Sequence, residues 1–198
     1  MQKIGQLGGK MEINKVYKFD EKLAQSKGVC KDNDMQIIKA MLHGCVKVTE
    51  ASLEMDKKGA DYIAKLRGNA EVYIDAKTRT KGCSKFWKNE PELAIERWSV
   101  LPEKGKNGKT GWTLDENKIT DLVLYTFDKS DSNNAYLVSF QTLRIASARN
   151  INAWYKKYKV DTQSSGEWKS QAVFVPVSIV FESMQAAQST SVRINNDS

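Results

Sequence analysis

The fold is decided by one stretch, Asp61-Tyr-Ile-Ala-Lys-Leu-Arg-Gly-Asn-Ala-Glu-Val-Tyr-Ile-Asp-Ala-Lys77. Its pattern predicts two strands joined by a tight turn about Gly68, which brings Asp61 level with Asp75. Asp75 and Lys77 are two residues apart on one strand, so they are expected to point to one face of the sheet. The hairpin should therefore gather two carboxylates and one ammonium, a set suited to a divalent cation and an attacking water in phosphodiester hydrolysis.

Net charge is the most informative property of the whole chain. The 198 residues carry a formal charge of +7, and the basic residues are spread along the sequence rather than collected in a tail. A basic balance favours a polyanionic partner, nucleic acid first. The length suits one domain of ordinary size with short appendages.

Cysteine and histidine usage argues against a zinc site. Cys30, Cys45 and Cys83 show no CxxC spacing, and His43 is the single histidine. An odd number of cysteines fits a reducing cytoplasm. No apolar run approaches the ~20 residues that span a bilayer, and the Gly-rich start of the chain lacks an apolar signal core. The sequence therefore predicts a cytoplasmic protein without a membrane partner.

Periodicity along the chain predicts an α/β fold, with a mixed central β-sheet flanked by helices. A flexible segment is expected at 1–14, a single domain at 15–188 and a disordered Ser/Asn-rich tail at 189–198. The expected helices are at 17–25, 32–44, 141–158 and from 176 onward, and the further expected strands are at 45–49, 93–101, 122–127, 135–140 and 172–175.

Two short motifs of the hairpin are similar to those of a known nuclease family. Gly59-Ala-Asp61-Tyr-Ile stands where that family has its first metal-binding Asp, and Tyr73-Ile-Asp75-Ala-Lys77-Thr-Arg stands where it has an acidic-x-Lys triplet. Over residues 30–140 the chain resembles the PD-(D/E)xK nuclease superfamily, which has a restriction-endonuclease-like core. It also resembles uncharacterised phage or prophage proteins with similar Asp-Ala-Lys-Thr-Arg blocks.

The resemblance implies a Mg²⁺-dependent endo- or exodeoxyribonuclease in a bacterial or phage-infected cell, with DNA favoured over RNA. It also implies Mg²⁺ or Mn²⁺ as cofactor and a possible homodimer, since many relatives pair to cut both strands. Asp61, Asp75 and the Ala76 carbonyl are then the metal ligands, because these hard cations prefer oxygen. Lys77 orients or deprotonates the attacking water.

Two departures from the family pattern bear on the site. Ala60 stands where the family name has Pro, and no Glu lies on the first helix. Asp34, on the first turn of the helix expected at 32–44, is the leading candidate for the missing acid and for a further metal ligand. Asp32 and Glu50 are the alternatives. Without such an acid, metal affinity would fall.

A basic-aromatic loop follows the acidic-x-Lys triplet and is the candidate nucleic-acid interface. Lysines there are suited to phosphates and aromatic rings to bases; the residues expected to bind are Arg79, Lys81, Lys85, Trp87 and Lys88. Phe86 is an alternative to Trp87 for stacking on a base. Core packing is the competing interpretation for both rings.

Other interpretations stay open on sequence alone. Asp75 with Lys77 or Arg79 also fits a salt bridge on a solvated sheet face. Glu96, on the expected neighbouring strand, is a weaker acidic candidate, and Gln141 at a helix start has capping as its plain explanation. The alternative function is a catalytically inactive nuclease-fold protein that binds nucleic acid or a protein partner, in a phage–host or defence role. A third possibility is a small α/β structural protein.

Overall fold

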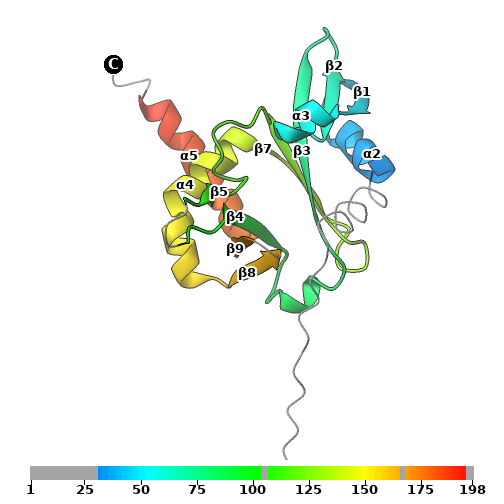
Figure 1. The fold of residues 1–198 in the computed structure, drawn as a ribbon. Coiled ribbons are helices and arrows are strands. Elements are labelled where there is room, and N and C mark those ends of the chain that lie inside the picture. Colours follow the sequence, from blue (N-terminus) through cyan, green and yellow to red (C-terminus); the bar gives the residue numbers. More distant parts are fainter. Residues whose placement is uncertain (1–30, 104–106, 166–167, 195–198) are drawn as a thin grey trace, which may run out of the picture.

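The chain folds into two β-sheets with helices against their outer faces (Figure 1). The structure is a computed structural model. It describes residues 31–103, 107–165 and 168–194, and their side chains except at 31, 32, 165 and 190–194. The flexible segment expected at 1–14 and the helix expected at 17–25 lie outside these residues. The α/β class and the mixed sheet are confirmed, whereas the second sheet is not predicted by the sequence.

The first sheet has five strands in the order β1-β2-β3-β6-β7. β3 and β6 run parallel, and every other neighbouring pair is antiparallel. The strands are β1 Cys45–Glu50, β2 Tyr62–Leu66, β3 Glu71–Arg79, β6 Leu122–Phe127 and β7 Ala135–Ser139. β6 is buried along almost its whole length, which explains why its sequence is a continuous apolar run rather than an alternating one.

The β2–β3 hairpin has the register that the sequence predicts. Tyr62 lies opposite Ile74 across the two strands. Gly68 in the turn has a φ of +85°, in the left-handed region that glycine adopts without steric cost. The positions just outside the first pair, Asp61 and Asp75, therefore lie side by side.

The second sheet holds four antiparallel strands in the order β5-β4-β9-β8. They are β4 Glu92–Val100, β5 Lys109–Thr110, β8 Val160–Ser165 and β9 Trp168–Pro176. The sequence predicts β4 as a neighbour of the hairpin, but its main partner is β9, with Ile95 opposite Val173. Alternating hydrophobicity identifies a strand without identifying its partner. β8 is polar and lacks alternating hydrophobicity, so the sequence does not predict it.

Helices account for much of the remaining described chain, at α2 Lys31–Met41, α3 Leu53–Lys57, α4 Phe140–Lys157 and α5 Val177–Ile194, with a 3₁₀ turn η1 at Ser84–Phe86. α4 begins close to its predicted start, because the Ser139 hydroxyl accepts a hydrogen bond from the Thr142 amide at 3.3 Å. α5 continues past residue 188, the predicted end of the domain. Within the described ranges, no helix has the length and apolar character needed to cross a membrane.

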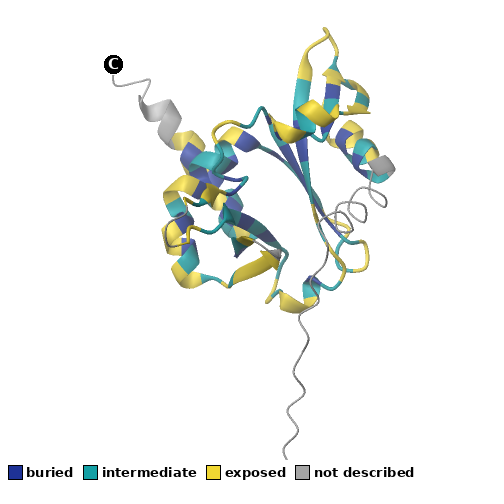
Figure 2. Cartoon of the chain, in the orientation of Figure 1, coloured by how far each residue is buried: buried dark blue, intermediate teal, exposed yellow. Residues whose placement is uncertain are grey.

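Two hydrophobic clusters lie on opposite faces of the five-stranded sheet (Figure 2). α2 covers one face, where Ile38 belongs to a buried cluster with Ile74 and Leu124. The second sheet, α4 and α5 share a larger cluster with the other face. Because side chains alternate along a strand, Ile74 points toward α2 while Asp75 and Lys77 point toward the second sheet. The candidate site therefore lies between the two sheets.

Candidate active site

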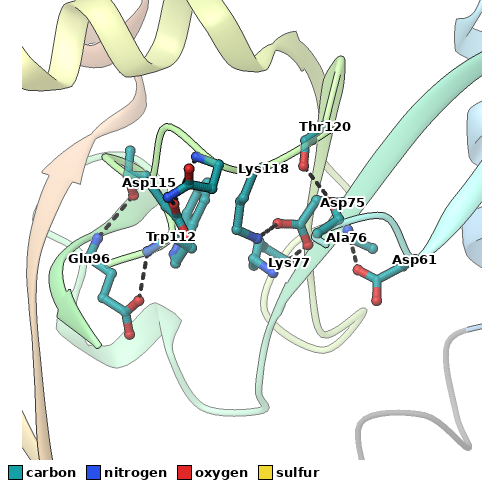
Figure 3. Close-up of polar contacts among 12 residues, drawn as sticks. Asp61, Asp75, Ala76, Lys77, Glu96, Trp112, Asp115, Lys118 and Thr120 are labelled. Atoms are coloured by element: carbon teal, nitrogen blue, oxygen red, sulfur yellow. Dashed lines mark hydrogen bonds and ion pairs between the residues drawn. The ribbon is translucent and has the colours of Figure 1, made fainter. Parts of the chain in front are cut away.

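The acid pair forms where β2 begins. Asp61 is the residue just before β2, and Asp75 lies on β3 with 2% of its surface exposed. The Ala76 amide donates a hydrogen bond to Asp61 Oδ2 at 2.8 Å, which fixes the Asp61 carboxylate against the backbone beside Asp75 (Figure 3). The hairpin thus turns two residues that are distant in sequence into neighbours.

Two ammonium groups bind the Asp75 carboxylate. Lys77 Nζ donates to Oδ1, and Lys118 Nζ donates to Oδ2 at 2.7 Å (Figure 3). Burial opposes ionisation of Asp75, but the charges of Lys77 and Lys118 outweigh it and hold the pKa of Asp75 below its ordinary value. The Lys77 side chain is 30% exposed, whereas the Asp75 side chain is almost fully buried.

The pKa of Asp61 is shifted in the opposite direction from that of Asp75. Burial, together with the negative charge of Asp75, raises the pKa of Asp61 to about 6, although Lys77 and the Ala76 amide act against the shift. The charged form of the Asp61 carboxylate is therefore disfavoured. A cation bound beside it would favour ionisation.

Asp61→Asn is expected to stabilise the protein at pH 7.5 by roughly 2 kcal/mol, a melting-temperature rise of about 5 °C. The pKa of Asp61 is about 6 when folded and 3.8 ordinarily, so the folded state binds more protons between these values. The contribution of Asp61 to the free energy of unfolding therefore falls as pH rises from 4 to 7. Asparagine does not titrate, so this decrease is absent in the variant. An asparagine oxygen still accepts the Ala76 amide proton. Thermal melts at pH 4.5 and 7.5 measure the effect.

The control for this prediction is Asp161→Asn, which makes the same chemical change at an exposed position of β8. Its melting temperature should follow that of the wild type at both pH values. If Asp61→Asn and Asp161→Asn behave alike, Asp61 does not carry the unfavourable charge described above.

Glu96 reaches the site from the second sheet. The sequence expects it on a strand next to the hairpin, but β4 belongs to the second sheet, so that expected position is corrected. Glu96 Oε2 accepts a hydrogen bond from the Trp112 amide at 3.0 Å, and the Trp112 ring centroid lies 5.4 Å from Lys77 Nζ (Figure 3). Burial raises the pKa of Glu96, while the Trp112 amide and the charges of Lys77 and Lys118 act against the rise.

Lys118 is the site residue that the sequence does not reveal. It belongs to one of several acidic-x-Lys triplets in this chain, and it reaches Asp75 only because of long-range contacts. The Ile119 amide donates to the Lys58 carbonyl at 3.1 Å, and the Thr120 hydroxyl donates to the Gly59 carbonyl. These bonds hold the loop before β6 against the residues that precede β2.

The structure does not bring Asp34 into the acid pair. Asp34 is 4% exposed on the α2 side of the sheet, where its Oδ2 accepts a hydrogen bond from the Tyr62 hydroxyl at 3.2 Å. Tyr62 and Asp61 are consecutive on the strand path, so their side chains point to opposite faces. The side chain of Asp32 lies outside the described residues. Glu50, at the end of β1, lies opposite Tyr62 in the register of β1 and β2.

The donor set is small but fits Mg²⁺. Among the residues that the structure describes, no group of three or more His, Cys, Asp or Glu side chains is arranged to hold a metal ion. Mg²⁺ is commonly bound by one or two carboxylates together with waters and substrate phosphate. Asp61 and Asp75 supply the carboxylates. The amide and the carbonyl of Ala76 lie on the same side of β3, which is the side where Asp61 lies. A bound cation would also offset the cost of ionising the buried Asp61 carboxylate.

Two of the predicted nucleic-acid-binding side chains make contacts within the protein. The Arg79 guanidinium lies 4.4 Å from the Phe174 ring centroid. The Trp87 ring packs edge-to-face on Phe127 at 5.2 Å, with its indole nitrogen buried. These contacts support the competing core interpretation for Trp87, whereas Arg79 is half-buried and stays a predicted binding residue.

The exposed part of the basic-aromatic loop is formed by other side chains. Lys81, Lys85 and Lys88 are exposed, as a phosphate contact requires. Phe86, rather than Trp87, is the exposed aromatic residue, with half of its surface accessible. Lys159 Nζ lies 4.0 Å from its ring centroid.

Gln141 plays no part in this cluster. It lies exposed in the first turn of α4, where its side-chain oxygen accepts a hydrogen bond from Arg144 at 2.8 Å. The cap itself comes from Ser139.

No protein-family model, curated protein or solved structure matches the chain. The chemical interpretation of the site therefore rests on the residues themselves and on their geometry.

Proposed function

We propose that the protein is a metal-dependent nuclease that hydrolyses phosphodiester bonds in DNA. The observation that carries the proposal is the meeting of Asp61, Asp75 and Lys77 on one face of the β2–β3 hairpin. The raised pKa of Asp61 is a second support, because a divalent cation beside this buried carboxylate would favour its ionised form. The net charge of +7 and the exposed Lys81, Lys85 and Lys88 suit a polyanionic substrate.

The reaction follows from these groups. Bound Mg²⁺ supplies Lewis acidity at the scissile phosphate. Asp61 and Asp75 hold the cation, and Lys77 orients the attacking water and offsets negative charge on the phosphate. The water oxygen bonds to phosphorus, the bond from phosphorus to the sugar oxygen of the leaving nucleotide breaks, the water proton passes to solvent and the leaving oxygen takes up a proton.

The proposal extends to fold and setting. A restriction-endonuclease-like core is supported by the mixed five-stranded sheet, by α2 on one face, and by the position of the acid pair where β2 begins. We also propose that DNA is preferred over RNA, that two copies pair to cut both strands, and that the protein acts in a bacterial or phage-infected cell. These parts rest on the resemblance of the hairpin motifs.

A second function has one specific observation in its favour. Both Asp75 oxygens are held by ammonium groups, and Asp34 lies on the other side of the sheet. A protein in which these ion pairs persist would bind nucleic acid, or a protein partner, without cleaving. The two functions are separated by incubating the protein with Mg²⁺ or Mn²⁺ and with supercoiled, linear and branched DNA. Binding without cleavage in every metal would select the second.

Mg²⁺ or Mn²⁺ is expected to raise the melting temperature of the wild type and to leave that of Asp61→Asn unchanged. A ligand at 100 times its Kd stabilises the folded state by about 2.7 kcal/mol, which corresponds to about 5–10 °C for a chain of this size. Differential scanning calorimetry with and without metal measures the shift. Equal shifts in wild type and Asp61→Asn would remove Asp61 from the metal site, and no shift in the wild type would remove the nuclease proposal.

A further inference from the structure

We propose that Lys118 is a built-in cation of the site, whose ammonium balances Asp75 and competes with a divalent metal for that carboxylate. This inference rests on the proposed function, since it concerns the same acid pair. It adds a residue and a means of setting metal affinity that the nuclease pattern does not include.

The contact with Asp75 is direct and shielded from solvent. Lys118 Nζ lies 2.7 Å from Asp75 Oδ2, and the Lys118 and Asp75 side chains are 15% and 3% exposed. Lys77 binds the other oxygen, Oδ1. A metal ion that uses Asp75 as a ligand must therefore share the carboxylate with two ammonium groups or displace one of them.

Hydrogen bonds of the residues that follow Lys118 fix the position of its backbone, and so of its side chain. The adjacent Ile119 and Thr120 bond to the carbonyls of Lys58 and Gly59, as described above. Gly59 has a φ of +98°, and a Cβ atom added there would lie 3.0 Å from the Lys118 stem. The stem thus occupies space that only glycine leaves open.

Lys118, rather than Lys77, is the group expected to yield to a metal ion. Lys77 is fixed two residues from Asp75 on the same strand, and it also lies near the Asp61 charge. Lys118 comes from a loop, and both Lys118 and Lys77 interact electrostatically with Glu96 as well as with Asp75. An ammonium released from Asp75 therefore still has a nearby carboxylate, so its movement need not expose an unpaired charge.

Titration of the protein with Mn²⁺ by isothermal calorimetry tests the inference. Lys118→Met should bind Mn²⁺ at least tenfold more tightly than the wild type, because one competing positive charge is gone. Lys118→Arg, which keeps the charge, should bind like the wild type. The matched control is Lys58→Met, which removes an exposed lysine paired with Glu54 beside the same backbone anchor.

The outcomes separate the inference from the proposed function. Metal binding by the wild type, with equal or weaker binding by Lys118→Met, overturns the role of Lys118 alone. Binding by Lys118→Met but not by the wild type supports the built-in cation and overturns the nuclease proposal. Binding by neither protein overturns both.

A measurement on the wild type covers the case in which Lys118→Met does not fold. Acetylation of lysines, followed by mass spectrometry, should label Lys118 more slowly than Lys58 in the absence of metal, since its amine is held at Asp75. Saturating Mn²⁺ should raise labelling of Lys118 severalfold and leave that of Lys58 unchanged. Labelling of Lys118 that does not respond to Mn²⁺ would overturn the inference.

Discussion

Lys77→Met is expected to lower Mg²⁺-dependent DNA cleavage about a thousandfold while the protein stays folded. Lys77 has the more exposed side chain of the two lysines that bind Asp75, which suits contact with a phosphate and an attacking water. Methionine keeps the apolar stem in the space near Trp112 and removes only the charge. The ratio of kcat/KM for wild type and variant, with supercoiled DNA as substrate, measures the loss.

The fold should survive this change because Lys118 still pairs with Asp75. A melting temperature within a few degrees of the wild-type value would show that the loss is chemical. The control is Lys65→Met, which removes an exposed lysine from β2 of the same hairpin and should cleave within twofold of the wild-type rate. Cleavage by Lys77→Met at the wild-type rate would exclude Lys77 from the reaction.

Asp75→Ala is expected to reduce the free energy of unfolding by about 3 kcal/mol and the melting temperature by about 10 °C. The change leaves the Lys77 and Lys118 ammonium groups without the carboxylate that both contact. Loss of one partner from a buried ion pair costs about 3–5 kcal/mol. The lower end applies here, because Lys77 is 30% exposed and can turn toward water. Urea denaturation of the metal-free protein at pH 7.5 measures the difference.

A double variant distinguishes this cause from a general packing defect. If the penalty comes from stranded ammonium groups, Asp75→Ala combined with Lys118→Met should be more stable than Asp75→Ala alone. Asp161→Ala, at an exposed position of β8, should lie within about 0.5 kcal/mol of the wild type. A double variant no more stable than Asp75→Ala would mean that ion pairing does not explain the loss.

The sequence predicts the parts of the site that depend on short-range order. The register of the β2–β3 hairpin follows from a turn at Gly68 and from strict alternation along both strands, so the neighbouring positions of Asp61 and Asp75 follow too. The same alternation predicts that Asp75 and Lys77 share a face. These conclusions need only the period of two that every strand has.

The parts that the sequence does not predict depend on which distant segments meet. Lys118 contacts Asp75 from the loop before β6, and Glu96 interacts electrostatically with the site from the second sheet. No local pattern encodes either approach. The placement of Trp87 against Phe127 is likewise a tertiary outcome, because an aromatic residue in a basic loop fits a core and a surface equally well. The resemblance predicts Asp34 at the site from its position on the first helix, and that position does not specify which face of the sheet the helix covers.

The pairing of β4 with β9 implies that the second sheet forms later in folding than the β2–β3 hairpin. Ile95 and Val173 lie opposite one another although 78 positions separate them. Strands that are distant in sequence pair slowly, and during synthesis β4 cannot pair with β9 until β9 has been made. The acid pair comes from a compact hairpin made much sooner, whereas the sheet that carries Glu96 is completed near the end. A nascent chain would therefore hold its two carboxylates well before their full surroundings exist, which makes maturation of the centre a late step of folding.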